Sequence, residues 1–409
     1  MNTEKIASVP SAEIDKKMLD SIKNIIESCN INFLIGSGLS APFFGTLGKI
    51  EVWLSDLEKE KEVPPEVKYY VRGCLYKRYF DVAMKKNNDI YDYDDSVNDY
   101  IDNPKLSKDK LHNTYKSYKN FLSIINHILY LRGRNTLSKQ VNVFTTNIDI
   151  FVEKVIEDLN LNFNDGFNGI FTKRFSLSNF KRSFFQKSLH YDNISEMPVF
   201  NLLKMHGSLT WELSNKVIIF DYLFGLDNVI EEEKKCEFIN IVELSKKLKI
   251  EEAKLDIKQI INEAKGMDSI PDIKNFVRAY EKLQIINPTK EKFKETTLNQ
   301  TYYELLRLYA NELEKENSVL FVMGFSFADE HIREITIRAV KSNPTLKLYI
   351  FSFWKNAEDI KNNFNDSDIN IEDFYNIELV TPFDKFDLRN INECIFRMVL
   401  DNIKKNSWE

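Results

Sequence analysis

An apolar run that leads straight into a glycine loop decides the fold of this chain: Ile31-Asn32-Phe33-Leu34-Ile35 is followed by Gly36-Ser37-Gly38-Leu39-Ser40-Ala41. A short apolar run that ends at a glycine is typical of a buried strand. The loop fits the pattern G-x-G-x-x-G/A, whose glycines permit a tight turn and a close backbone approach to a pyrophosphate. The N-terminus of a helix beyond the loop would favour negative charge. An ordinary turn from strand to helix is the alternative.

Similar apolar runs recur along the chain and alternate with segments of helical periodicity. Strands are expected at 141–144, 199–205, 318–324, 346–353 and 377–380, and helices at 14–29, 49–86 (broken at Pro64-Pro65), 115–132, 150–159, 298–316, 329–342 and from 388 onward. Strands that alternate with helices indicate a parallel sheet covered by helices. The predicted fold class is therefore α/β, a Rossmann-like parallel sheet with helical insertions that form a smaller subdomain.

The spacing of the expected strands favours one domain, 1–409, that is interrupted twice by helical material. The insertions are expected at about 45–140 and about 225–300, and residues 318–409 then complete the sheet. A dehydrogenase of this fold would reach its second strand after one helix, with an acidic residue about 20 positions further on. Here the next strand is expected only at 141–144, which argues against hydride transfer.

Polar side chains stand just past the second expected strand, in Thr145-Thr146-Asn147-Ile148-Asp149. Ligands bind at the carboxyl ends of strands in open α/β sheets. The Asn147 amide can hold a ribose hydroxyl or a water without carrying charge, and the Asp149 carboxylate can accept hydrogen bonds from a carboxamide NH2 group. Alternatively, either residue caps the helix that follows.

A histidine follows the third expected strand, in Lys204-Met205-His206-Gly207-Ser208. A neutral imidazole at this place can take a proton from a ribose hydroxyl or from water. The alternative is a structural or solvated histidine. Together the glycine loop, the pair Asn147 and Asp149, and His206 suit cleavage of the bond between nicotinamide and ribose in NAD.

Composition argues against several other classes of function, namely nucleic-acid binding, membrane contact and metal binding. The 409 residues carry a formal net charge of −6, and short basic runs are dispersed among acids. A broad surface for duplex nucleic acid needs clustered Lys and Arg, so direct nucleic-acid binding is not expected. We find no apolar signal core and no run long enough to span a bilayer, which favours a cytoplasmic protein without membrane contact. The four cysteines stand apart from one another, so no metal site is expected.

These motifs resemble those of the sirtuin superfamily over roughly residues 30–355. The similarity is carried by GSGLSAP at 36–42, TTNID at 145–149, KMHGS at 204–208 and VMGFSFADEHI at 322–332, and Ile286–Lys290 is similar to a stretch that precedes the last of these. The resemblance implies that NAD is the substrate and lies along the strand ends, with its adenosine side near Ser326. The residues that it implies for NAD binding are Gly36, Ser37, Gly38, Ser40, Asp149, Gly324 and Ser326.

Two features depart from the protein deacylases of this superfamily. The four-cysteine zinc module is absent, and Pro42-Phe43-Phe44-Gly45-Thr46 stands where a Gly-Ile-Pro-x-Phe-Arg stretch is usual. The chain is more similar to the sirtuin-like NAD hydrolases of bacterial antiphage systems, and in its arrangement to the subunit that assembles with a HerA-type ATPase. The resemblance implies hydrolysis of NAD+ to nicotinamide and ADP-ribose during infection, by a homo-oligomer partnered with a hexameric HerA-type ATPase.

On this interpretation Asn147 and His206 are the catalytic residues. Asn147 would position the ribose or the attacking water, and His206 would act as the base. Two alternatives stay open. One is an NAD-dependent protein deacylase or ADP-ribosyltransferase that uses the same chemistry. The other is a non-enzymatic subunit that senses NAD or ADP-ribose and controls a partner ATPase.

Overall fold

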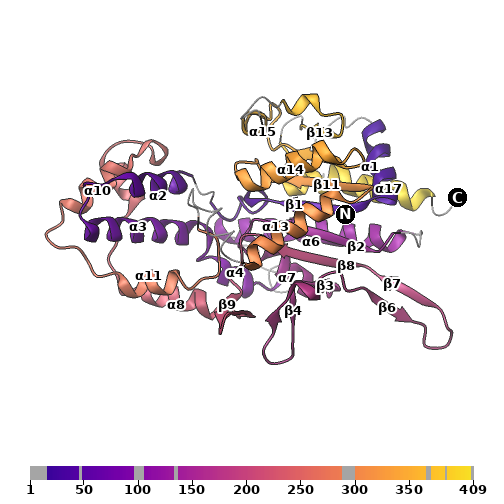
Figure 1. The fold of residues 1–409 in the computed structure, drawn as a ribbon, viewed down its shortest axis with the longest axis horizontal. Coiled ribbons are helices and arrows are strands. Elements are labelled where there is room, and N and C mark those ends of the chain that lie inside the picture. Colours follow the sequence, from indigo (N-terminus) through magenta and orange to yellow (C-terminus); the bar gives the residue numbers. More distant parts are fainter. Residues whose placement is uncertain are drawn as a thin grey trace, which may run out of the picture.

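A seven-stranded parallel sheet forms the centre of the molecule (Figure 1). The computed structural model describes residues 16–45, 48–95, 106–132, 137–287, 300–364, 370–382 and 385–406. The predicted α/β fold with a Rossmann-like parallel sheet is confirmed, since every neighbouring pair of strands is parallel. In order across the sheet the strands are β13 (Ile377–Val380), β12 (Lys347–Phe351), β11 (Ser318–Met323), β1 (Asn30–Ile35), β2 (Gln140–Thr145), β8 (Val199–Lys204) and β3 (Phe163–Asn164).

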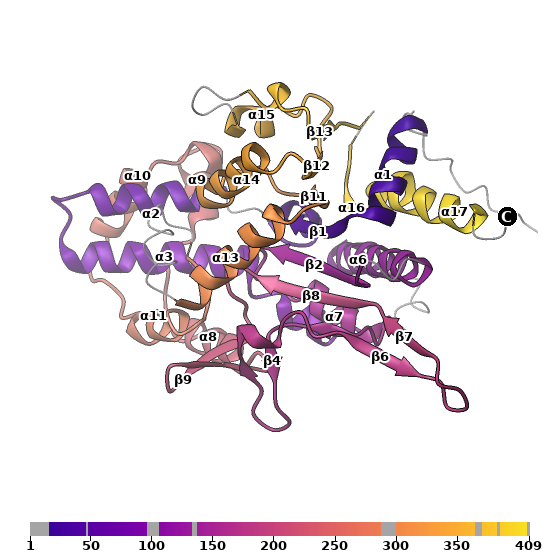
Figure 2. The same cartoon turned by 45° about the vertical axis from the view of Figure 1, so that its right-hand side comes forward.

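Helices cover both faces of the sheet (Figure 2). Successive residues of a strand point to opposite faces, so Phe33 of β1 packs on one helical layer and Leu34 on the other. Because both faces are covered, most strands are apolar almost throughout, which is why the sequence revealed six of the seven. The two-residue strand β3 was not predicted. One layer holds α1 (Lys16–Ser28), α6 (Leu106–Leu131), α7 (Phe151–Asp158), α16 (Leu388–Ile391) and α17 (Arg397–Asn406), and the other holds α13 (Gln300–Glu314), α14 (Glu330–Ser342) and α15 (Glu358–Phe364).

The chain changes its direction across the sheet between β1 and β11. From β1 it runs to β2 and β8 on one side, and it later places β11 and β12 on the other side. Such a switch point leaves a crevice at the carboxyl ends of two central strands, because the connections depart in opposite directions. Gly36 follows β1 and Gly324 follows β11, so the glycine loop borders this switch point.

A row of asparagines crosses the face of the sheet beneath α13. Asn32, Asn142 and Asn201 occupy matching positions on β1, β2 and β8. The Asn142 amide donates to Asn32 Oδ1 at 2.8 Å, and the Asn201 amide donates to Asn142 Oδ1 at 3.0 Å. Asn164 of β3 donates to Asn201 Oδ1 at 2.8 Å, and Glu312 of α13 accepts from Asn142 at 3.1 Å. A one-residue slip in strand register would leave these groups unpaired, so the row fixes the alignment of four strands.

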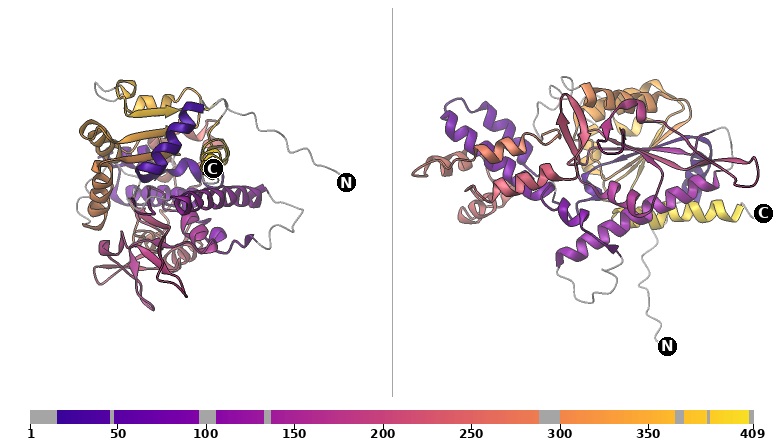
Figure 3. Two further views of the ribbon diagram at one scale, coloured as in Figure 1. Left: turned by 90° about the vertical axis from the view of Figure 1, so that its right-hand side faces the viewer. Right: turned by 90° about the horizontal axis from the view of Figure 1, so that it is seen from below.

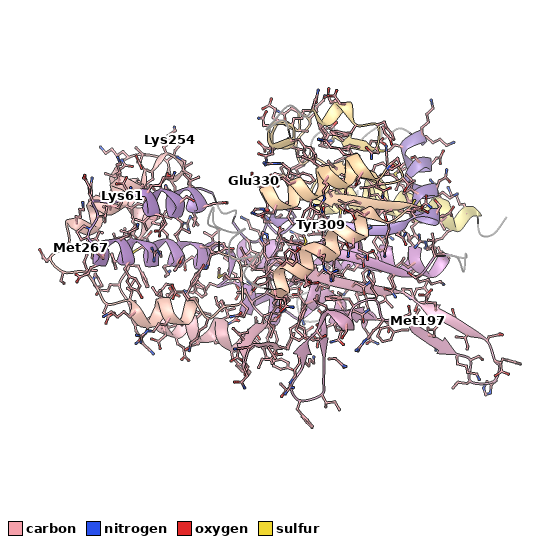
Figure 4. The ribbon with its side chains drawn as sticks, viewed as in Figure 1. Lys61, Met197, Lys254, Met267, Tyr309 and Glu330 are labelled. Atoms are coloured by element: carbon pink, nitrogen blue, oxygen red, sulfur yellow. The ribbon has the colours of Figure 1, made fainter. Side chains whose placement is uncertain are left out.

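The helical insertions meet in a lobe at one end of the molecule (Figure 1). The lobe consists of α2 (Ile50–Lys59), α3 (Pro65–Ala83), α8 (Phe224–Glu233), α9 (Ile241–Lys247), α10 (Ile257–Lys265) and α11 (Lys274–Tyr280). Trp53 of α2 donates its indole N–H to the Leu255 carbonyl at 2.9 Å, and Tyr76 stacks on Tyr280 with ring centroids 4.5 Å apart. Figure 4 labels Lys61, Lys254 and Met267 in this lobe, and Tyr309 and Glu330 in the body.

The long helix α6 does not belong to this lobe, although it falls within the first expected insertion, about 45–140. It lies on the sheet, where Phe121 meets Phe33 edge to face with ring centroids 5.0 Å apart. An amphipathic pattern shows that one side of a helix is buried, but it does not show which element buries it.

Two further small sheets are formed by strands between residues 167 and 220, and the sequence analysis did not predict them. A four-stranded antiparallel sheet contains β4 (Phe167–Asn168), β5 (Arg174–Phe175), β9 (Trp211–Ser214) and β10 (Val217–Phe220), and a ribbon pairs β6 (Phe184–Lys187) with β7 (Ile194–Met197). Figure 3 shows the hairpins projecting from the body. The strands β4 and β5 have two residues each, and β6 is exposed throughout, so no buried apolar run marked these three. The strand β10 is an apolar run, Val-Ile-Ile-Phe at 217–220, that the sequence analysis overlooked.

Parts of several expected features lie outside the described residues, among them the starts of the helices expected at 14–29 and 298–316 and parts of the insertion expected at about 45–140. The insertion expected at about 225–300 and the segment Ile286–Lys290 both extend into 288–299, which the structure does not describe.

The short helix α4 (Asn87–Tyr91) packs on α7, and Asn87 accepts a hydrogen bond from the Ile150 amide at 3.1 Å. Across the described ranges no helix combines the length and the apolar character needed to cross a bilayer.

Candidate functional site

A cleft of about 1360 Å³ lies at the carboxyl ends of the central strands. Glu51 of α2 and Tyr79 of α3 line it from the lobe. Gly36, the first residue of the glycine loop, is buried and does not line the cleft. The three motifs, although far apart in the sequence, share this one cavity. The other residues that were expected to form the site all line it: Ser37, Gly38, Ser40, Asn147, Asp149, His206, Gly324 and Ser326.

The glycine loop packs backbone to backbone on the turn that follows β11. The Gly38 amide donates to the Gly324 carbonyl at 2.9 Å. A Cβ atom on Gly36 would lie 2.4 Å from the same carbonyl oxygen, and one on Gly38 would lie 2.8 Å from it. Gly324 has φ +63°, and a Cβ there would lie 2.6 Å from the Leu39 amide nitrogen. Contact with backbone atoms therefore demands glycine at all three positions.

The loop continues into a single 3₁₀ turn, Ser37–Leu39, and not directly into an α-helix. The next helix, α2, begins only at Ile50. Pro42 and Gly45 lie in between, and neither is tolerated well inside a helix. A phosphate at this loop would meet the exposed backbone at its start without the dipole of a full helix.

Asn147 is held in place by the glycine loop. Its Nδ2 donates to the Gly36 carbonyl at 3.2 Å and to Ser40 Oγ at 3.3 Å, and its backbone amide donates to Thr145 Oγ1 at 3.0 Å. Its Oδ1 is buried and has no hydrogen-bond partner among the described residues, so Asn147 does not cap α7. A buried acceptor in this state costs about 1–3 kcal/mol, and a donor such as a hydroxyl group or a water satisfies it.

Asp149 lines the cleft and also hydrogen-bonds to the backbone just after it in the chain. Its Oδ1 accepts a hydrogen bond from the Phe151 amide at 3.2 Å. Asp149 therefore contacts the first residue of α7, which agrees in part with the alternative prediction that it caps this helix. Burial raises the pKa of Asp149, and the charge of Lys204 opposes that rise. Lys204 is itself buried; its Nζ donates to the Asp149 carbonyl and lies 2.8 Å from Glu153 Oε1. The buried cation thus fixes this segment and favours the carboxylate form of Asp149.

His206 faces a carboxylate that the sequence analysis did not assign to the site. His206 Nε2 lies 3.2 Å from Asp329 Oδ2, and these side chains are only 16% and 7% exposed. Asp329 also caps α14, because its Oδ1 accepts from the amides of His331 and Ile332 at 3.2 and 3.3 Å. With Nε2 turned toward the carboxylate, Nδ1 is the ring nitrogen left to accept a proton. In the sequence Asp329 stood at the start of an expected helix and within the 322–332 motif, but no local pattern links it to His206.

A glycine also sets the position of the histidine. Gly207 has φ +78°, and a Cβ there would lie 2.0 Å from the Gln284 carbonyl oxygen. The Ser208 amide donates to that carbonyl at 3.1 Å, and the His206 carbonyl accepts from the Ile286 amide at 2.9 Å. The end of β8 is therefore tied to the chain that returns from the lobe.

Tyr118 of α6 is a second residue that the sequence analysis missed. Its hydroxyl lies 2.9 Å from Ser40 Oγ, and its ring stacks on Phe151 with centroids 5.3 Å apart. Burial holds the pKa of Tyr118 well above its ordinary value, so it stays a neutral phenol. Tyr118 thereby supports the Ser40 hydroxyl that holds Asn147. Helical periodicity located this helix, but only packing against the glycine loop shows the role of one tyrosine on it.

The other end of the cleft is aromatic and more open. Ser326 is exposed, and its carbonyl accepts from Asn363 Nδ2 at 2.7 Å. Phe353 and Trp354 follow β12 and line the same cleft, at 41% and 55% exposed. Exposed rings offer a stacking surface to a planar group. The cleft therefore has a buried polar end with Asn147 and an aromatic end.

A scan against protein-family models found no match, and neither did a search of curated proteins. In the described part of the chain no three His, Cys, Asp or Glu side chains gather as metal ligands would. The cleft offers a fixed amide, an imidazole beside a carboxylate, and a wall of glycine backbone. These groups suit proton transfer next to a positioned sugar or water.

We expect Gly324→Ala to destabilise the protein more than Gly48→Ala does. Both glycines have positive φ, +63° and +54°, so both variants strain the backbone. A Cβ at position 48 meets nothing within 4 Å, whereas one at position 324 reaches Leu39. The additional loss should be about 1–3 kcal/mol, the usual cost of overpacking. Urea unfolding of both variants measures it, and equal losses would contradict the close backbone contact.

We expect the damage caused by Lys204→Met to grow as the pH rises. Burial raises the pKa values of Asp149 and Glu153, so these carboxyls are favoured while protonated and cost stability as the pH rises through their folded pKa values. Without the opposing Lys204 charge this cost increases, toward about 3 kcal/mol at neutral pH.

Urea unfolding at a series of pH values from acid to neutral measures this effect. Lys247→Met is the matched control, because the Lys247–Glu263 pair is exposed and should contribute no more than about 1 kcal/mol. A loss for Lys204→Met that stays constant with pH, or that matches the control, would show that the buried cation does not act on these carboxyls.

Proposed function

We propose that this chain hydrolyses NAD+ at the bond between nicotinamide and ribose, giving nicotinamide and ADP-ribose. The observation that carries the proposal is the meeting of Asn147, His206 and the glycine loop in one cleft at the carboxyl edge of the sheet. The resemblance to the sirtuin superfamily lies in these same segments. The cleft also provides a glycine-walled side for a pyrophosphate and aromatic rings for a base.

The proposed reaction needs few groups. The bond between nicotinamide and ribose breaks, and its electron pair stays on the ring nitrogen of nicotinamide. Electron-rich groups that are fixed in advance stabilise the oxocarbenium character left on the ribose. Asn147 Oδ1 accepts a hydrogen bond from the ribose or from the attacking water, and His206 takes a proton as the water oxygen adds to the anomeric carbon. Asp149, as a carboxylate, accepts from the carboxamide of nicotinamide.

Asp329 has a supporting part in this proposal. An imidazolium forms when His206 takes the proton, and the nearby Asp329 carboxylate stabilises its charge. The same contact fixes the ring orientation, so Asp329 is a positioning residue rather than one that touches NAD.

The biological setting is proposed from the resemblance alone. Hydrolysis would deplete NAD during phage infection in the cytoplasm, and the chain would work as a homo-oligomer with a hexameric HerA-type ATPase. An enzyme of that kind must be held inactive until infection, so the assays below include a candidate HerA-type ATPase.

Asn147→Ala and His206→Ala should each abolish the release of nicotinamide from NAD. Removing the amide or the base should each cost on the order of 100-fold or more. The purified protein is incubated with NAD, alone and with the candidate ATPase, and free nicotinamide is quantified. Asn168→Ala and His127→Ala are matched controls, because both residues are exposed and lie outside the cleft.

The outcomes separate the proposal from its alternatives. Full turnover by both variants would show that the assigned roles are wrong. Release of O-acyl-ADP-ribose from an acyl-lysine peptide would indicate a deacylase. Tight binding of intact NAD without turnover in any of these mixtures would indicate a sensing subunit.

Asp329→Asn should separate the two roles of Asp329. Asparagine caps a helix about as well as aspartate, so the unfolding free energy should change by less than about 0.5 kcal/mol. The charge opposite His206 is lost, and turnover of NAD should fall on the order of 100-fold because the base is misplaced. Asp329→Ala should lose both cap and charge. Wild-type turnover by Asp329→Asn would show that only the cap matters.

A further inference from the structure

The charged side chains that line the cleft are mostly acidic. The described lining contains one lysine, Lys355, and no arginine. The acids of the lining are Glu51, Asp149, Asp329, Glu358 and Asp359. A cleft lined mainly by one sign of charge selects its ligands by their charge. This cleft suits the cationic nicotinamide of NAD+, and it disfavours every phosphate that a ligand carries beyond the pyrophosphate.

Two of these acids lie at the aromatic end of the cleft, in the first turn of α15. The chain turns back after Trp354, whose carbonyl accepts from the Ala357 amide at 3.2 Å. Glu358 and Asp359 follow directly, and both are exposed. Phe353 and Trp354 meet edge to face with ring centroids 4.6 Å apart. The turn therefore sets two carboxylates beside the rings that the proposed function assigns to a base.

Further contacts fasten α15 to the wall of the cleft. Asn363 of α15 donates to the Ser326 carbonyl at 2.7 Å. Phe364, the last residue of α15, meets Phe327 edge to face with ring centroids 4.6 Å apart. Ser326 and Phe327 follow β11, so α15 is attached to the strand end that also carries Gly324. Packing of the helix therefore holds the backbone of its two acids at the cleft.

We propose that the aromatic end of the cleft selects NAD+ over NADP+. The inference rests on the proposed function, because it requires the adenine base to stack on the aromatic rings. The ribose attached to that base then lies within reach of Glu358 and Asp359, which accept hydrogen bonds from its hydroxyl groups. NADP+ carries a phosphate on the 2′-oxygen of this ribose. The two carboxylates repel that phosphate, which has up to about two negative charges.

Lys355 does not reverse this preference. At this end of the cleft one exposed cation stands with two carboxylates, so the local charge stays negative. A site that accepts a 2′-phosphate typically provides an arginine, whose planar guanidinium binds two phosphate oxygens, and the described lining contains none. NAD+ and NADP+ share the same pyrophosphate, so a contact between Lys355 and the pyrophosphate does not distinguish them.

Turnover of NAD+ and NADP+ by the same preparation tests this proposal. With the candidate ATPase in both mixtures, kcat/KM for NAD+ should exceed kcat/KM for NADP+ at least about tenfold. The double variant Glu358→Gln with Asp359→Asn should lower this ratio about tenfold, because the repulsion is removed. Glu62→Gln with Glu66→Gln is the matched control. Both acids are exposed near the start of α3 and lie outside the cleft, so this variant should keep the wild-type ratio.

Binding measurements separate this inference from the proposed reaction, because they need no turnover. Calorimetric titrations use ADP-ribose and ADP-ribose 2′-phosphate as probes. ADP-ribose should bind at least about tenfold more tightly at about 0.1 M salt. The difference should shrink at about 1 M salt, because the Debye length falls from about 10 Å to about 3 Å. A cleft that excluded the phosphate by size alone would keep the difference.

The outcomes distinguish the failure of this inference from the failure of the proposed function. Equal binding of the two probes, or a difference that neither salt nor the double variant narrows, would overturn selection by charge and leave the proposed hydrolysis in place. Tighter binding of ADP-ribose 2′-phosphate would also overturn it, and would assign that phosphate to Lys355. If neither probe binds, the proposed function and this inference are both wrong.

Discussion

The site depends on a contact between two backbone turns that leaves no room for side chains. At the switch point of the sheet the loops after β1 and β11 cross, and Gly36 and Gly38 rest against the Gly324 carbonyl. This contact places the Gly36 carbonyl where it accepts from Asn147, and the Ser40 hydroxyl where it meets both Asn147 and Tyr118. The orientation of the amide therefore follows from how closely two strands' loops approach. A phosphate-binding turn is the more familiar use of such glycines, but here close packing alone already requires them.

Buried charges hold the rest of the polar end. Lys204 donates a hydrogen bond to the Asp149 carbonyl, and Asp329 faces His206 while it also caps α14. Each of these groups is tied to a secondary-structure element as well as to a residue on the cleft. Such double use makes the site stiff, because moving the imidazole or the carboxylate would also disturb a helix start or a buried ion pair.

Much of the fold was predictable, because the strands of a parallel sheet are buried on both faces and therefore appear in the sequence as apolar runs. The ends of parallel strands meet at one edge, so motifs after β1, β2 and β8 had to converge once those strands were identified. Tyr118 and Asp329 were not predictable, because their roles depend on which faces of α6 and α14 meet the loops. No α-helix follows the glycine loop directly, because Pro42 and Gly45 disfavour one, and the next helix begins at Ile50, close to the expected residue 49. The exposed strands β6 and β7 lack the alternation that marks a half-buried strand.

The order of the strands has a consequence for how the protein is made. Asn30 of β1 lies opposite Ser318 of β11, so the central strand waits for a neighbour that leaves the ribosome much later. Until then β1 presents an unpaired apolar edge, which favours slow maturation and a need for chaperones during synthesis. The cleft can form only after β11 has left the ribosome, so a partly translated chain lacks one wall of the cleft.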